Sequence, residues 1–504
     1  GMRCFIVDDA IPGVFAEGVH DRAHGSALAQ KQRFHGMKSN SNLAITDLSF
    51  SHLLAKILPQ MKRLAYNELL EWKKRTPRKP LLLRGARQVG KSFLVREFGK
   101  KEFHAFVEIN FERNPEFSNI FHGGTTDGVL QQLETHFHVH LRKPETDVLL
   151  FLDEIQAAPR VLPQLRYFHE EYPGLAVVAA GSLLDTALAE EPQSMPVGRV
   201  EYFFLGPMIF EEFLEAKGDA GLLETISKYS LGGDIPEFIH GKLLEAAREF
   251  FFVGGMPEAV ATYATTHSLL EVERIKQSIL STYQDDFYKY APRTHCERLR
   301  KVFRAITRHV GEKWKHVRVG AEERSRDVKR ALELLEAARV CYRVGHSAAN
   351  GVPLGAEARE DFFKVLFLDV GLACGASGLE WKDLLDLGFF SVAQGAYAEQ
   401  FVGQHLLYGL APWREPELHY WARERRGASA EVDYVISKGA EIIPIEVKAG
   451  KAGTLKSLRL FVDEKKVGRA VRFNAEPPSI LRENDFELIS LPLYLAGQLR
   501  RIIG

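Results

Sequence analysis

The sequence predicts a multidomain α/β protein: a parallel sheet covered by helices, a helical middle, and a second α/β domain at the carboxyl end. Three observations carry this prediction. Apolar runs alternate with helical patterns over residues 61–214, which is typical of a parallel sheet with helices on both faces. The strand signal disappears from 215 to about 271, and a second helical block follows over residues 276–350. Two closely spaced strand patterns then follow at 430–436 and 441–448.

A chain of 504 residues is long enough for several domains with cores of their own. We expect a poorly structured extension (1–60), a P-loop core (61–214), a helical lid (215–275), a winged-helix-like domain (276–350) and a carboxyl-terminal domain (351–504). The extension is rich in Gly, Ala, His, Ser and charged residues and has no sustained periodicity. The alternative for the lid is a helical subdomain with no role at a nucleotide.

Composition describes a soluble globular protein, with 45% hydrophobic and 26% charged residues. The formal net charge is zero, so any surface for nucleic acid must be local. The four cysteines, Cys4, Cys296, Cys341 and Cys374, form no C-x-x-C pair, which argues against a disulfide framework and a zinc site. No apolar run is long enough to span a bilayer, so we expect a cytoplasmic protein with no membrane partner.

The first predicted strand, 81–84, runs directly into a phosphate-binding loop and then a helix. The loop pattern G-x-x-x-x-G-K-[ST] is formed by Gly85, Ala86, Arg87, Gln88, Val89, Gly90, Lys91 and Ser92. In such loops the backbone N–H groups and the helix N-terminus surround the phosphates. We expect Lys91 to reach the β- and γ-phosphates and the Ser92 hydroxyl to hold Mg²⁺. The chain is therefore predicted to bind ATP.

Two further buried strands end in polar residues that suit hydrolysis. The strand at 148–153 ends in Asp153, a candidate Mg²⁺ ligand, and Glu154 follows, placed to polarise the attacking water. The alternative is a strand that stops at a solvated acidic turn. The strand at 177–180 leads to Ser182, where ATPases of this type place a residue that senses the γ-phosphate.

Arg199 lies in the loop before the last strand of this domain, 201–205. An arginine there is suited to neutralise charge on the transferring phosphoryl group, within one chain or across a subunit interface. An ordinary surface salt bridge is the alternative role.

A basic stretch follows in the helical middle. Between Arg298 and Arg330 there are twelve Lys or Arg residues and four Asp or Glu residues. Helical patterns at 302–310 and 328–338, followed by a strand pattern at 340–344, resemble a winged helix-turn-helix. The candidate recognition side chains are Arg324, Arg326, Lys329 and Arg330. DNA is the predicted partner; the alternative is a solvated basic face that packs against the protein's own acidic surface.

The carboxyl-terminal domain carries three carboxylates and a lysine in a suggestive pattern. Glu446 and Lys448 project from one face of a strand, Asp433 lies on the neighbouring strand, and Glu399 lies on a helix that begins near 395. Glu399, Asp433 and Glu446 supply oxygen ligands suited to Mg²⁺ or Mn²⁺, and Lys448 would orient the nucleophile or stabilise developing charge. An Asp followed after about a dozen residues by Glu-x-Lys is the PD-(D/E)xK nuclease pattern. The alternatives are strands with surface acids, or a nuclease-like fold kept as a binding module.

Together these motifs resemble a prokaryotic family of AAA-type ATPases that carry a carboxyl-terminal domain of unknown function with a nuclease-like fold. The resemblance extends from about residue 61 to the end. It is carried by residues 85–92, 152–156, 181–182, 198–199, 255–258, 364–371, 395–399, 431–433 and 445–448. The resemblance implies an AAA core, a winged helix and a nuclease-like domain as separate units. One departure is Ala180, where relatives often carry Thr, which leaves γ-phosphate sensing to Ser182.

The sequence thus predicts an ATPase that uses Lys91, Ser92, Asp153 and Glu154 and acts on DNA, with a second Mg²⁺ or Mn²⁺ in the nuclease-like domain. The alternative is a nucleotide-dependent switch that binds a protein partner and has a degenerate nuclease fold. A homo-oligomer is compatible with this class of ATPase, and Arg199 would act in trans only if subunits meet.

Overall fold

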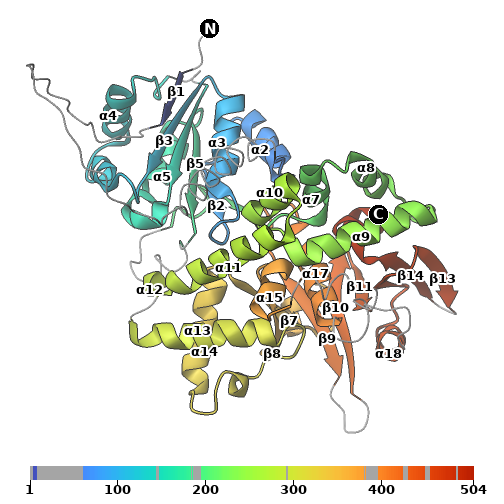
Figure 1. Cartoon of the computed structure of the whole chain (residues 1–504). Helices are drawn as coiled ribbons and strands as arrows, with labels where there is room; N and C mark the ends of the chain where they lie inside the picture. The colour runs from blue at the N-terminus through green and yellow to red at the C-terminus, as the bar shows by residue number, and fades with distance from the viewer. Residues whose placement is uncertain are drawn as a thin grey trace, which may run out of the picture.

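A computed structural model describes residues 4–7, 61–143, 147–182, 184, 195–290, 293–379, 381, 395–423, 429–448, 455–483 and 486–504. Two β-sheets lie at opposite ends of the molecule, and long helices of the middle segment run between them (Figure 1). Within the described residues, no helix has both the length and the apolar character needed to cross a membrane.

The first sheet has six strands, and all of its pairings are parallel. The strands are β1 (Cys4–Val7), β2 (Leu81–Arg84), β3 (Ala105–Asn110), β4 (Val148–Asp153), β5 (Ala176–Gly181) and β6 (Glu201–Phe204). They lie in the order β1-β3-β4-β5-β2-β6. Because β5 lies between β2 and β4, Ser182, which follows β5, lies between the carboxyl ends of β2 and β4.

Helices cover both faces of this sheet, as the apolar runs predict. The helices are α2 (Ala65–Lys74), α3 (Lys91–Glu102), α4 (Thr126–Phe137) and α5 (Gln164–Glu171). Alternate strand residues such as Leu81 and Leu83 pack with α2 and α3, whereas Leu82 packs with α4 and α5. The strands are therefore buried on both faces, which is why they read as continuous apolar runs.

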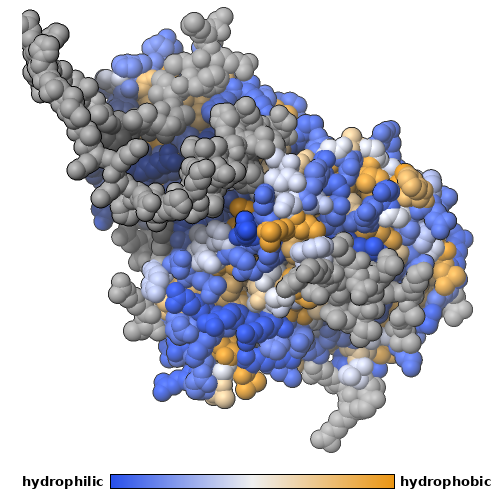
Figure 2. Space-filling model, viewed as in Figure 1, coloured by the Kyte–Doolittle hydropathy of each residue, from blue (hydrophilic) through white to orange (hydrophobic). Residues whose placement is uncertain are grey.

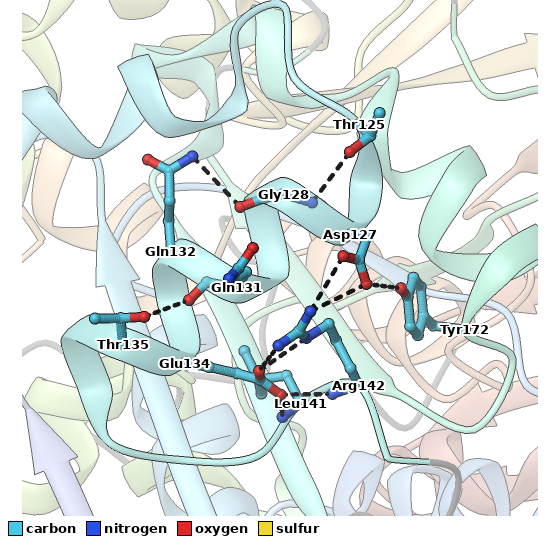
Figure 3. A network of polar contacts seen from close by, with 10 residues as sticks. All are labelled: Thr125, Asp127, Gly128, Gln131, Gln132, Glu134, Thr135, Leu141, Arg142 and Tyr172. Carbon is cyan, nitrogen blue, oxygen red and sulfur yellow. Dashed lines mark hydrogen bonds and ion pairs between the residues drawn. The ribbon is translucent and has the colours of Figure 1, made fainter.

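The segment after α4 is fixed by one arginine, Arg142 (Figure 3). Its guanidinium contacts Glu134 at 2.8 Å and Asp127 at 3.1 Å, and Tyr172 donates a hydrogen bond to Asp127. The Thr125 side chain caps α4 by accepting from Gly128 N. These contacts stabilise the approach to β4 and lie apart from the phosphate-binding loop.

The middle of the chain is helical, as predicted, but its boundaries differ from those expected. The helices are α7 (Phe210–Lys217), α8 (Ala220–Lys228), α9 (Glu237–Val253), α10 (Pro257–Thr266), α11 (Leu269–Asp285), α12 (Phe287–Tyr290), α13 (Arg293–Arg308) and α14 (Ser325–Ala337). The expected boundary at 275/276 falls inside α11, so the two segments that it was expected to separate share one continuous helix.

The second sheet has eight strands in the order β13-β14-β12-β11-β10-β9-β7-β8. The strands are β7 (Cys341–His346), β8 (Arg359–Phe367), β9 (Leu418–Arg423), β10 (Ala430–Lys438), β11 (Glu441–Val447), β12 (Arg469–Asn474), β13 (Ser479–Glu483) and β14 (Phe486–Pro492). Its helices are α15 (Val370–Ala376), α17 (Gly395–Tyr408), α18 (Lys456–Lys465) and α19 (Leu499–Ile502). Short 3-10 helices lie at Pro115–Phe121, Ile155–Ala157, Pro159–Val161, His316–Arg318, Leu354–Glu357 and Leu493–Gln498.

Two further expectations need correction. The boundary at 350/351 divides the antiparallel pair β7–β8, and β7 also pairs with β9, so this hairpin belongs to the carboxyl-terminal sheet. A separate winged-helix unit therefore does not describe these strands. The extension 1–60 was expected to be poorly structured, yet Cys4–Val7 forms β1, which pairs with β3 in parallel at the sheet edge.

Asp369, a fully buried carboxylate before α15, connects the loop after α9 to helices of the second sheet. It accepts hydrogen bonds from Leu372 N at 2.9 Å, from Gly255 N at 2.6 Å and from the Gln404 side chain at 3.3 Å. It thereby caps α15 and fixes both the loop after α9 and helix α17.

We expect Asp369→Ala to lower the free energy of unfolding by about 2–4 kcal/mol, because a helix cap and two buried amide groups lose their acceptor. Asp369→Asn keeps one carbonyl oxygen and should lose less than half as much. Urea unfolding of the two variants measures this order. Equal stability of Asp369→Ala and the wild-type chain would contradict the role given to Asp369.

Candidate active site

The segment Gly85–Ser92 connects the end of β2 to the start of α3 and forms a loop with inward-turned backbone. Gln88 and Gly90 have positive φ values of 63° and 90°. A Cβ at Gly85 would lie 2.1 Å from the carbonyl oxygen of Leu205, so only glycine fits there. A loop of this shape at a helix N-terminus is suited to bind a phosphate group.

Lys91, Ser92 and Asp153 meet at this loop. The Lys91 ammonium donates to the carbonyl oxygens of Gly85 at 2.9 Å and Ala86 at 2.8 Å. The Ser92 hydroxyl donates to Asp153 Oδ1 at 2.9 Å. The hydroxyl and the carboxylate expected to share a Mg²⁺ ion are therefore adjacent.

Burial perturbs both charged groups. Burial lowers the pKa of the Lys91 ammonium to about 8, and the carboxylates of Glu154 and Asp153 oppose this shift. Burial and then the neighbouring Glu154 charge raise the pKa of Asp153 to about 6. A bound phosphate would stabilise the charged form of Lys91, and a bound cation would stabilise the charged form of Asp153. Perturbed pKa values of this kind are common at functional sites.

Glu154 and Ser182 complete the edge of the sheet. Glu154 has a φ of 51° and accepts a hydrogen bond from Gln156 Nε2 at 2.5 Å. Ser182, directly after β5, is buried, and its hydroxyl has no hydrogen-bond partner among the described residues. Since β5 lies between β2 and β4, this free hydroxyl lies between the loop and Asp153.

Three site residues were missed from the sequence. Asn110 pairs in register with Asp153 and donates to Asp153 Oδ2 at 3.1 Å. Arg96 lies 3.7 Å from Asp153 and bonds the buried Glu108. Two features of the sequence could have identified these residues. Strand 105–110 ends in a polar residue, and Arg96 lies one helical turn after Ser92.

The loop is also held from outside the sheet. Arg63 donates to the carbonyl oxygens of Val89 and Gly206, each at 2.8 Å, and pairs with Glu212 at 3.0 Å. Two contacts come from the carboxyl end of α11. There, Asp286 pairs with the Arg87 guanidinium, and the Tyr283 hydroxyl donates to the Arg87 carbonyl oxygen.

Arg199 is not brought to this loop within one chain. It precedes β6, which is parallel to β2, and Leu81 at the start of β2 pairs with Glu201. Arg199 therefore lies at the edge of the sheet opposite the loop. Its guanidinium is partly exposed and pairs with Glu170 at 2.7 Å.

The predicted nuclease-like residues do come together, but around a lysine. Lys364 of β8 lies 3.2 Å from Glu399, 2.5 Å from Glu431 and 3.8 Å from Asp433. Lys364 and Glu431 were not predicted as site residues. The alternation of side chains along a strand places Glu431 on the same face as Asp433, and this was the available signal.

The expected divalent-metal site of Glu399, Asp433 and Glu446 is not supported by this geometry. Lys448 bonds Glu446 at 2.5 Å instead of facing open space. No group of three or more His, Cys, Asp or Glu side chains in the described ranges is arranged to hold a metal ion. Burial and then the Asp433 charge raise the pKa values of Glu399 and Glu446.

Some cations of the basic stretch 298–330 form ion pairs, and others form none with the described residues. On α13, Arg298 contacts Glu323 at 2.6 Å and Lys301 contacts Glu322 at 2.9 Å. The candidate recognition residues at the start of α14 are Arg324, Arg326, Lys329 and Arg330. All four are exposed, and none forms an ion pair with another described residue. The face over α13 and α14 is mostly hydrophilic (Figure 2).

Comparison with protein families gives three separate matches. Residues 77–214 match the AAA domain family, which agrees with the parallel sheet and the loop. Residues 244–383 and 394–494 match two domains of unknown function, DUF8612 and DUF4143. Strands β2 to β6 of the first sheet thus lie in a segment that matches an AAA domain, and the two later matches assign no activity.

Among curated proteins no relative of the chain was found. Two solved structures show weak similarity. PCH-2 of C. elegans is 13% identical with a TM-score of 0.24, and the match covers 46% of this chain and 64% of PCH-2, less than two thirds of its length. ORC2 of Aeropyrum pernix, as ADPNP-ADP complexes, is 14% identical with a TM-score of 0.31, covering 65% of this chain and 92% of ORC2. At these TM-scores neither structure carries an argument.

We expect Asp153→Asn to stabilise the nucleotide-free protein by about 2 kcal/mol at pH 7.5. The folded pKa of about 6 exceeds the ordinary value of 3.8, so ionised Asp153 opposes folding. This effect is complete above pH 6 and disappears as the pH falls towards 4. The measurement is the unfolding free energy of both proteins at pH 7.5 and pH 5.

The exposed Asp234 supplies the control, since Asp234→Asn should change stability little at either pH. An Asp153→Asn protein that is less stable than wild type at pH 7.5, or a gain that does not shrink at pH 5, would contradict the strained state of Asp153.

Proposed function

We propose that the chain is a Mg²⁺-dependent ATPase that acts on DNA. The observation that carries the ATPase part is the convergence of Lys91, the Ser92–Asp153 pair and the buried Ser182 hydroxyl at one end of a sheet that matches an AAA domain. These donors and acceptors fit a triphosphate with its magnesium ion.

Each residue has a role in this proposal. Lys91 and the loop N–H groups bind the phosphates, and Ser92 and Asp153 hold Mg²⁺. When bound, Mg²⁺ neutralises charge on the phosphate oxygens. Glu154 orients and polarises the attacking water, and Ser182 contacts the γ-phosphate. If Arg199 contributes to turnover, it acts on the nucleotide of a neighbouring copy in a homo-oligomer, because it lies at the opposite edge of its own sheet.

We expect Glu154→Gln to bind ATP as tightly as wild type and to hydrolyse it at least about 100-fold more slowly, because only the water-polarising carboxylate is lost. Lys91→Ala should lose binding itself. Calorimetric titration and phosphate release separate these effects. Wild-type turnover by Glu154→Gln would remove Glu154 from the mechanism.

The DNA part of the proposal is supported by α14. Arg324 directly before α14 and three cations on it are exposed and have no ion-pair partner in the described part of the chain, and they form a local positive surface on a chain without net charge. The order α13, α14 and the β7–β8 hairpin is compatible with a helix-turn-helix followed by a wing. Here the wing would be part of the carboxyl-terminal sheet.

Nucleotide hydrolysis would reach this surface through α11. The Arg87 side chain and carbonyl oxygen are held by Asp286 and Tyr283 at the end of α11, and α12 and α13 follow next in the chain. A loop that moves with its nucleotide therefore pulls on the segment that carries α13, which packs against α14.

A nucleotide-dependent switch that binds a protein partner is the second candidate. This candidate is favoured by the carboxylate cluster, because the Lys364 ammonium lies at its centre, as expected for a degenerate nuclease fold. In that case the carboxyl-terminal unit would bind a partner and cut nothing.

The double substitution Arg326→Ala/Lys329→Ala should weaken duplex binding and reduce the slope of log affinity against log salt by about two, because each lost phosphate contact releases one fewer counterion. Fluorescence anisotropy over a salt series measures the slope. Lys228→Ala/Arg482→Ala, which removes two exposed cations elsewhere, is the matched control. Duplex affinity that is independent of salt in the wild-type chain would refute DNA binding by α14.

A further inference from the structure

Lys364 occupies the centre of the carboxylate cluster. Its side chain is almost completely buried, yet it carries a charged group among Glu399, Glu431 and Asp433 at 2.5–3.8 Å. Lys364 lies on β8, Glu399 on α17, and Glu431 and Asp433 on β10, so three carboxylates from two elements converge on one ammonium group. A buried ammonium of this kind is stable only with such partners.

The remaining carboxylate, Glu446, lies beside the same group. Tyr434 pairs with Ile445 in the antiparallel pair β10–β11, so Asp433 and Glu446 are cross-strand neighbours. Asp433 Oδ2 already accepts a hydrogen bond from Val447 N at 2.8 Å. Glu446 Oε1 pairs with Lys448, while Glu446 Oε2 is buried and has no hydrogen-bond partner among the described residues. Four carboxylates are therefore gathered at this place, and Lys364 and Lys448 form ion pairs with them.

The cluster is also covered. The segment after α13 crosses it: Lys313 bridges to Lys364 in the backbone and its side chain lies 3.4 Å from Glu431. A Cβ at Gly311 would lie 3.2 Å from Glu399 Oε2. A phosphodiester approaching Asp433 would have to displace this segment, because the Asp433 side chain is only 10% exposed.

We propose that the Lys364 ammonium is the resident cation of this cluster and takes the place of the divalent ion that a nuclease-like fold implies. A divalent ion bound to Glu399 and Asp433 would lie against the ammonium and be repelled by it. The lysine thus closes the site to Mg²⁺ and Mn²⁺ while leaving the carboxylates in place. This inference does not rest on ATP hydrolysis, because the cluster shares no residue with the phosphate-binding loop.

The test is Mn²⁺ binding by the full chain without nucleotide, measured by electron paramagnetic resonance and calorimetry. All proteins carry Asp153→Asn, so the Mg²⁺ position at the loop does not contribute. With Lys364 intact, we expect no Mn²⁺ site that depends on Asp433. Lys364→Met/Glu431→Gln removes the ammonium and its nearest carboxylate and keeps Glu399, Asp433 and Glu446. This double variant should bind one Mn²⁺ ion with a dissociation constant at least tenfold lower than that of any Mn²⁺ binding by the protein with Lys364 intact. Adding Asp433→Asn should abolish that site.

Two controls test whether a positive charge at position 364 is what excludes Mn²⁺. Lys364→Arg keeps a cation and should remain closed, and Lys313→Met removes a lysine at the rim of the cluster and should also remain closed. Circular dichroism and thermal melting establish that each variant is folded. If Lys364→Met/Glu431→Gln does not fold, Lys364→Gln, which removes the charge and keeps polar atoms, replaces it.

Two results would overturn the proposal. One is a Mn²⁺ site in the protein with Lys364 intact that Asp433→Asn removes, because the cluster would then already be open. The other is a folded variant without the Lys364 charge that gains no Mn²⁺, because the lysine would then not be what excludes the ion.

Discussion

The attachment of the phosphate-binding loop to residues outside its own sheet is the constraint on which the rest of the structure depends. Arg63 holds the Val89 carbonyl oxygen, and the end of α11 holds Arg87 by its side chain and its carbonyl oxygen. A loop of this kind is commonly supported by the strand and helix that flank it. Here the end of a helix almost 200 residues later in the chain shares that support, so the loop is bonded directly to the helical middle of the chain.

Charge compensation explains why the two candidate sites differ. At the loop, Asp153 is buried beside Ser92 with a raised pKa, and the buried Ser182 hydroxyl has no hydrogen-bond partner among the residues that the structure describes. At the carboxylate cluster, Lys364 already supplies the positive charge that the acids require. The first arrangement favours binding of a cation with a phosphate, and the second favours a stable structural element.

The amino-acid pattern of short segments was sufficient to predict several elements. The buried strands, the loop 85–92 and the two acids at the end of β4 follow from apolar runs and from residue spacing. The position of Lys364 does not, because it depends on β8 belonging to the same sheet as β10, an order set by tertiary packing. The contact between Arg87 and Asp286 was missed for the same reason. The expected boundaries differ from the structure at two places: one falls inside the continuous helix α11, and the other falls between β7 and β8, which pair with each other.

The central claim is that the nucleotide at the loop is coupled through α11 to the basic surface of α14. The most direct measurement is duplex affinity at fixed salt with a non-hydrolysable ATP analogue and with ADP, in wild type and in Asp286→Asn. Coupling of this kind predicts an affinity difference of about fivefold or more between the two nucleotides in wild type. It also predicts a much smaller difference in the variant. Equal duplex affinity in both nucleotide states of the wild-type chain would contradict the claim.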